Sequence, residues 1–149
     1  MRLTLYLVAC ACLSCSSAPE QRLLGAWRSD RDLTLASIEQ VDDLSSEERA
    51  SLYEPGFFGQ LIHVWGSRQG ISIFEGECGS PTPYTISDST SNSITVQYYD
   101  EFYEAAQSRV IYLGHKQIAL PILDGRAREI FVRADLDVLK AQFPCLASF

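Results

Sequence analysis

The stretch Ser93-Ile94-Thr95-Val96-Gln97-Tyr98-Tyr99 alternates apolar and polar side chains along most of its length. Successive side chains of a β-strand point to opposite faces, so this alternation predicts a strand over residues 93–99 with one buried face. Asp88-Ser89-Thr90-Ser91-Asn92, which precedes it, has the composition of a turn. Ile71-Ser72-Ile73 repeats the alternation upstream. This part of the chain is therefore expected to be built from short strands and turns.

The same reading extends over most of the chain. An opening strand is predicted at residues 22–30, and seven more at residues 60–65, 71–75, 83–87, 93–99, 109–113, 117–122 and 128–133. Their spacing of roughly ten residues, with turn signals between them, indicates an antiparallel meander. A closed barrel leaves no unpaired edge strand. We therefore predict an all-β fold, an eight-stranded antiparallel up-and-down barrel.

Two short helices accompany the strands. Ser45 and Glu48 have the spacing of a capping box, which predicts a helix over residues 45–53 between the first two strands, ended by Pro55-Gly56. Residues 135–143 form a second candidate helix, ended by Pro144.

Composition sets limits on function. The chain has 149 residues, of which 46% are hydrophobic and 21% charged, as in an ordinary globular domain. It has 12 Lys and Arg against 19 Asp and Glu, a net charge of −7. This balance argues against a basic nucleic-acid interface and against a polybasic membrane patch.

The N-terminus has the features of an export signal. Met1-Arg2 precedes an apolar run over residues 3–13, which is shorter than the about 20 residues that span a bilayer. With Cys15 after a small residue, the segment resembles a bacterial lipoprotein signal, in which such a cysteine is lipidated and becomes residue one. Cys10 and Cys12 are alternative sites, plain secretion is an alternative fate, and a buried N-terminal strand an alternative structure.

The domain boundaries follow from this signal. Residues 1–15 are predicted as the signal peptide, 16–21 as a linker and 22–149 as the barrel. The expected location is the periplasmic side of a bacterial membrane, with secretion as the alternative. An N-terminal lipid would be the membrane contact.

Cysteine counting fits an exported protein. Of five cysteines, setting aside the three early ones leaves Cys78 and Cys145, an even pair for an oxidising compartment. A disulfide between them is expected. A zinc site is the alternative, and it would need ligands beyond this pair, for which His63 and His115 are the histidines at hand.

Leu24-Gly25-Ala26-Trp27 resembles the Gly-x-Trp motif of the lipocalin-like, or calycin, barrels. In that family the Trp closes one end of the barrel and an Arg of the last strand lies over its ring. The resemblance thus implies that Gly25, Trp27 and Arg133 meet there. Some members tie the C-terminal tail to a mid-barrel strand by a disulfide, which is similar to Cys78 with Cys145. The resemblance covers residues 23–145, and the family's Thr-Asp-Tyr signature is missing.

No catalytic signature was found, so we expect no enzyme, no cofactor and no metal. His63 lies on a predicted strand and His115 in a turn, and neither belongs to a nucleophile elbow or a phosphate loop. Asp100, Glu101 and Glu104 follow a predicted strand and precede a turn, which favours a solvated acidic loop over a pair of glycosidase carboxylates. A second acidic set could offer oxygen ligands to Ca²⁺, but its spacing does not fit a calcium loop: Asp30, Asp32, Asp42 and Asp43.

The aromatic run over residues 98–103 is the most unusual local feature. Tyr98 continues the apolar face of its strand and is expected in the core. Tyr99, Phe102 and Tyr103 are candidate contacts for a ligand at the barrel mouth or for a partner protein, and simple packing of a loop is the alternative.

Two classes of function follow. In the first, the barrel holds a small apolar or amphipathic ligand, because eight strands leave room for one such molecule. In the second, side chains fill the barrel and the protein is an interaction module of the cell envelope, such as an inhibitor, an immunity protein or an assembly factor. An internal cavity larger than several waters favours the first, and a filled barrel with an exposed aromatic patch the second.

Overall fold

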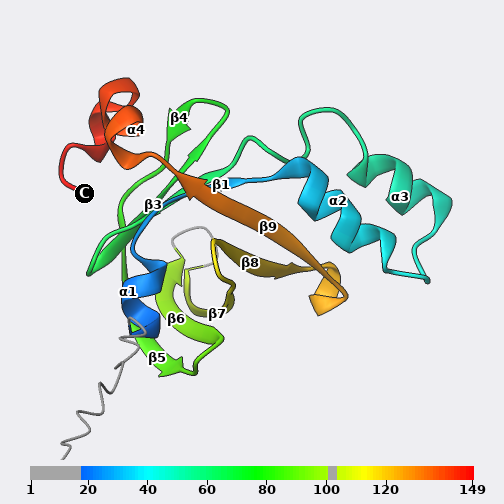
Figure 1. The fold of residues 1–149 in the computed structure, drawn as a ribbon, viewed down its shortest axis with the longest axis horizontal. Helices are drawn as coiled ribbons and strands as arrows, with labels where there is room; N and C mark the ends of the chain where they lie inside the picture. The colour runs from blue at the N-terminus through cyan, green and yellow to red at the C-terminus, as the bar shows by residue number, and fades with distance from the viewer. Residues whose placement is uncertain (1–17, 101–103) are drawn as a thin grey trace, which may run out of the picture.

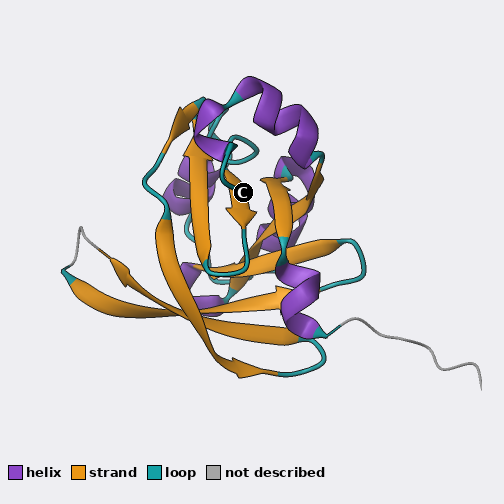
Figure 2. Cartoon of the chain, turned by 90° about the vertical axis from the view of Figure 1, so that its left-hand side faces the viewer, coloured by secondary structure: helices purple, strands orange, loops and turns teal. Residues whose placement is uncertain are grey.

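The computed structural model describes residues 18–100 and 104–149. It confirms the predicted closed eight-stranded antiparallel barrel, with a short helix after the first strand and another at the C-terminus (Figures 1 and 2). The strands are β1 (Gly25–Ser29), β2 (Ile62–Trp65), β3 (Gln69–Phe74), β4 (Glu77–Cys78), β5 (Thr82–Ser89), β6 (Ser93–Asp100), β7 (Ala105–Leu113), β8 (Gln117–Ile122) and β9 (Ala127–Ala134).

Eight of these strands form the ring, in the order β1-β9-β8-β7-β6-β5-β3-β2 and back to β1. The two-residue strand β4 pairs with β3 outside the ring. β1 closes the barrel because it pairs on one side with β9, where Trp27 lies opposite Arg133. On its other side it pairs with β2, where Trp27 lies opposite His63. Apart from the closing pair β1 and β9, neighbours in the ring are consecutive ring strands along the chain, as expected for a meander.

The first strand begins later than predicted. Residues Pro19–Leu23 form helix α1, so the predicted strand start at Arg22 is wrong and part of the predicted linker is helical. Proline suits the first turn of a helix, where no N–H is needed from it. Leu23, at the end of α1, is fully buried in the barrel's apolar interior. The packing of Leu23 against distant strands therefore determines where α1 ends and β1 begins.

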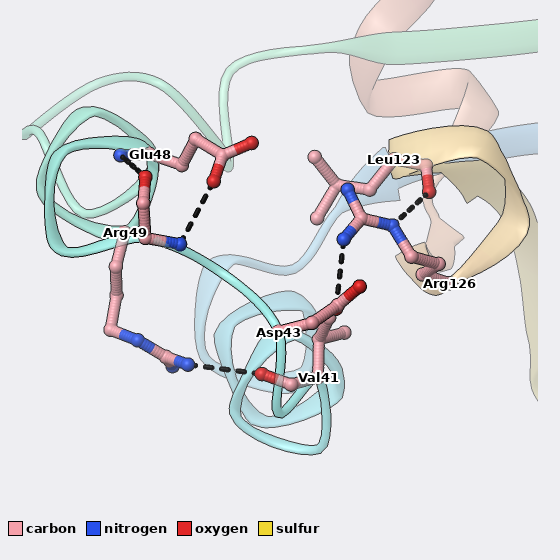
Figure 3. Close-up of polar contacts among 7 residues, drawn as sticks. Val41, Asp43, Glu48, Arg49, Leu123 and Arg126 are labelled. Carbon is pink, nitrogen blue, oxygen red and sulfur yellow. Dashed lines mark hydrogen bonds and ion pairs between the residues drawn. The ribbon is translucent and has the colours of Figure 1, made fainter.

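The connection between β1 and β2 contains two helices where one was predicted. Helix α3 (Ser46–Leu52) has the predicted capping box, in which the Ser45 hydroxyl accepts from the Glu48 N–H and the Glu48 carboxylate accepts from the Ser45 N–H. Figure 3 shows this region. The Arg126 guanidinium reaches Asp43 at 2.8 Å and so ties the β8–β9 connection, which holds the short helix η1 (Leu123–Gly125), to this helical segment.

Helix α2 (Arg31–Glu39) was not predicted, and it packs beside β9 where β9 has no neighbouring strand on the β1 side. β9 extends past the end of β1, so backbone N–H groups of β9 lack a strand partner there. The Thr34 hydroxyl accepts from the Ile130 N–H and the Ser37 hydroxyl from the Arg128 N–H, both at 2.9 Å. Side chains of α2 therefore supply the hydrogen-bond acceptors that a neighbouring strand supplies elsewhere in the sheet, since backbone N–H groups need partners.

The apolar core is divided between the inside and the outside of the barrel. The interior cluster is made of Leu23, Trp27, Ile94, Val96, Ile111, Leu113, Ile118, Leu120 and Phe131. The outer face of β1, β2 and β3 is covered by the C-terminal segment, helix α4 (Leu136–Gln142) and the short helix η2 (Pro144–Leu146), in a cluster of Ala26, Ile62, Val64, Ile71, Ile73, Leu139 and Leu146. In Figure 1, α2 and α3 extend from the other end of β1 and β9.

Candidate ligand cavity in the barrel

The structure brings the three residues of the lipocalin resemblance together at one end of the barrel. Trp27 is only 3% exposed, and its Nε1–H donates to the Leu23 carbonyl at 2.7 Å. The Arg133 Cζ lies 3.8 Å from the centre of the Trp27 ring, within cation–π range. Arg133 also donates to the carbonyls of Leu24 and Arg22, which fixes α1 against β9. Gly25 has φ of +110°, and a Cβ there would strike the Arg133 guanidinium.

The structure joins Cys78 to Cys145 in a disulfide, with the two Cα atoms 6.6 Å apart. Cys78 belongs to β4 and Cys145 to η2, so the bridge holds the C-terminal segment against the sheet that it covers. No group of three or more potential metal-ligating side chains occurs in residues 18–100 and 104–149. Cys10, Cys12 and the predicted lipidation site Cys15 lie outside the described residues.

A row of side chains connects the closed end to the barrel interior. Directly paired residues of neighbouring strands lie on the same face of a sheet. Arg133 is opposite Trp27, Trp27 is opposite His63, and His63 is opposite Ser72. Because Trp27 lies in the interior cluster, His63 and Ser72 face the interior too. By the same argument Arg109 faces inward, since it pairs with Val96 of that cluster.

A cavity of about 260 Å³ lies beside this row. Its lining combines aromatic, polar and small residues: His63, Trp65, Gly70, Ile71, Ser72, Gly79, Ser80, Thr82, Tyr84, Tyr98, Asp100 and Arg109. The cavity adjoins the ladder between β3 and β5, which contains two residue pairs. The ladder between β7 and β8 is equally short, and those between the other ring neighbours are longer. Beyond the ladder between β3 and β5 the chain leaves the ring to form β4, so side chains from both strands surround an incompletely filled space.

His63 carries a buried nitrogen without a partner. The side chain is 8% exposed, and its Nδ1 lies 2.8 Å from the Ser72 hydroxyl oxygen. Its Nε2 has no hydrogen-bond partner. Burial, together with the positive charge of Arg109, lowers the pKa of His63 to about 4, so the ring is neutral near pH 7. A neutral imidazole carries one N–H, and the partner at Nδ1 decides which nitrogen holds it.

Trp65 has a second unpartnered nitrogen in the same cavity. Its buried indole Nε1–H, which can only donate, has no acceptor. The ring packs edge-on against Tyr84, with centroids 5.1 Å apart, and lies 6.1 Å from the His63 ring. Gly70 makes room for it, because a Cβ there would lie 3.2 Å from the Trp65 ring. The Tyr84 hydroxyl is already used, since it donates to the Gly66 carbonyl at 2.6 Å.

Arg109 brings a positive charge to the cavity. Its guanidinium lies 5.9 Å from the centre of the Tyr98 ring. The Arg109 charge also acts on Glu129, a half-buried carboxyl that accepts a hydrogen bond from the Ser29 hydroxyl at 2.7 Å. Burial raises the pKa of Glu129. The ion pair found within the described chain joins Arg126 and Asp43, on a different part of the molecule.

Tyr99, the one predicted contact residue that the structure describes, does not line this cavity. Tyr99 is 57% exposed, and its neighbours Tyr98 and Asp100 are the residues of β6 that reach the cavity. Phe102 and Tyr103 lie outside the described residues. Trp65, Arg109 and Ser72 were missed, and His63 was interpreted as a residue without a functional role. Polar residues at inward positions of predicted strands were a usable signal, but only once the strand register was known.

No helix in the described parts of the chain combines the length and the apolar character needed to cross a membrane. No family model, curated protein or solved structure matches this sequence.

Proposed function

We propose that this protein is a lipocalin-like barrel that binds one small amphipathic ligand in the cavity beside His63 and Trp65. The observation that carries the proposal is the cavity itself. Its volume of about 260 Å³ exceeds that of several water molecules, each of which occupies about 30 Å³ in the liquid. Ligand pockets of about 300–1,000 Å³ hold drug-sized molecules, so the ligand here is expected to be smaller.

The lining fits a ligand with one polar and one apolar end. Tyr84 and Tyr98 offer apolar surface, whereas Trp65, His63 and Arg109 offer polar groups close by. A few polar groups in a mostly apolar pocket typically fix the orientation of a ligand. We further propose that the protein is exported and anchored by a lipid at Cys15, so that it would meet its ligand in the cell envelope.

Calorimetric titration with octan-1-ol, a small neutral amphiphile, tests whether the cavity binds ligands. Wild-type protein is expected to show saturable binding with one site per chain. Ser72→Leu places a larger apolar side chain in the cavity and should weaken binding at least about tenfold, or 1.4 kcal/mol. Ser108→Leu is the matched control, because Ser108 lies on the outer face of β7 and is exposed. No saturable heat with the wild type, or equal binding by the Ser72 variant, would contradict the proposal.

A protein-interaction module is the second candidate function. It is favoured by Phe57 and Phe74, which are 53% and 48% exposed and line one pocket of about 300 Å³ near α3. Exposed aromatic side chains that lie together are common in protein interfaces. The titration above separates the two candidates, because an interaction module with a filled barrel has no saturable site for octan-1-ol.

A further inference from the structure

Two buried nitrogens in the cavity have no hydrogen-bond partner in the protein. Within the described residues, the buried polar side-chain atoms without a partner are the Trp65 Nε1 and the His63 Nε2, and both residues line this one cavity. Almost all buried polar groups in proteins have a partner, and leaving one without costs stability. The two rings lie 6.1 Å apart, so one molecule bound between them would supply a partner to both nitrogens.

The chemistry of the two nitrogens defines what that molecule must offer. The Trp65 indole can only donate, so the ligand atom beside it must be an acceptor. His63 can also donate from Nε2, provided that the Ser72 hydroxyl donates to Nδ1, and the 2.8 Å contact allows this direction. A ligand acceptor at Nε2 favours this tautomer. Both nitrogens can therefore serve one oxygen-rich group.

Arg109 brings a positive charge to the cavity, which favours a negatively charged acceptor. Its guanidinium carries only donors and stays protonated, and it pairs well with planar carboxylates. In the part of the chain that the structure describes, the ion pair that forms lies away from Arg109. Asp100, the carboxylate that lines the cavity, has an interaction partner of its own. Arg109 lines the cavity from an inward position of β7 while its side chain stays exposed to solvent, so in a chain with a net charge of −7 it places a positive charge on the solvent-accessible side of the cavity.

We infer that the ligand is a small organic anion, a carboxylate with an apolar tail. Its carboxylate accepts hydrogen bonds from Trp65, His63 and Arg109, and its tail lies against Tyr84 and Tyr98. This inference rests on the proposed function, since it names the chemical class of the ligand of the same cavity.

The test compares sodium octanoate with octan-1-ol by calorimetric titration at pH 7, since the two probes have the same chain length and differ in the charged group. Wild-type protein is expected to bind octanoate at least about tenfold more tightly than octan-1-ol, because hydrogen bonds to a charged group are stronger than neutral ones. Arg109→Met should abolish this preference, so that octanoate binds no more tightly than octan-1-ol to the variant. Arg128→Met is the matched control, because Arg128 packs on Tyr112 at 4.0 Å and does not line the cavity.

The possible outcomes distinguish the inference of an anionic ligand from the proposal that the cavity binds a ligand. Equal binding of the two probes would overturn the anion inference and leave the ligand cavity standing. Binding of neither probe would overturn both. A preference for octanoate that survives in Arg109→Met would also overturn the inference. If that variant fails to fold, Arg109→Gln with far-ultraviolet circular dichroism as a check on folding gives the same comparison.

Discussion

Replacing Trp27 with alanine is expected to lower the free energy of unfolding by about 3–5 kcal/mol, because it removes a large buried ring and leaves a cavity. Arg133→Ala alone should cost about 1–2 kcal/mol, since it removes the contact with that ring and its packed stem. A double-mutant cycle, measured by urea unfolding, is expected to give a coupling energy of about 1 kcal/mol.

A second cycle provides the control for this result. Arg128 packs over Tyr112 on the outer face and does not touch Trp27, so losses from Trp27→Ala and Arg128→Ala should add. Additive losses for Trp27 and Arg133 would contradict their contact. The lipocalin-like closure, in which β1 and β9 meet through these two side chains, would then have to be abandoned.

Removing the bridge with Cys78→Ser and Cys145→Ser together is expected to cost about 4 kcal/mol. The two cysteines are 67 residues apart, and in the chain-entropy model a cross-link over such a loop restricts the unfolded chain strongly. The same change frees the segment that covers the outer face of β2 and β3. Urea unfolding of the oxidised protein and of the double variant measures the difference.

The wild type in reductant is the control for this second prediction. It should unfold like the double variant, since both lack the bridge. Two free thiols at Cys78 and Cys145 in a non-reducing peptide map of exported protein would contradict the pairing. They would also remove the cysteine argument for an oxidising compartment.

The strands and turns of the barrel were predictable because their causes are local. Alternation such as that of Ile94, Val96 and Tyr98 identifies a strand and its inward face, and turn residues mark where each strand ends. The capping box at Ser45 is local too, and it was correctly predicted. Helix α2 was missed because its position depends on distant partners. Its Thr34 hydroxyl satisfies the Ile130 N–H, which lies 96 residues away.

The cavity could not be predicted from the sequence for the same reason. Whether Trp65 and Arg109 share a space depends on the register of β2, β6 and β7, and register is a property of the closed barrel. The short ladder between β3 and β5 likewise depends on where β4 leaves the ring. Predicted contacts on β6 instead followed the aromatic run, whose Tyr99 points away from the interior. An aromatic cluster can be identified in the sequence, whereas a buried nitrogen without a hydrogen-bond partner can be identified only in the three-dimensional structure.

The central claim is that a ligand binds beside Trp65, and the two tryptophans of this chain allow a direct test. In a ¹H–¹⁵N correlation spectrum each contributes one indole N–H signal. The Trp27 N–H is bonded to the Leu23 carbonyl, whereas the Trp65 N–H has no partner. On titration with octanoate, the Trp65 indole signal is predicted to shift with saturation while the Trp27 signal stays in place. Two unchanged signals throughout the titration, or a shift of the Trp27 signal alone, would contradict the claim.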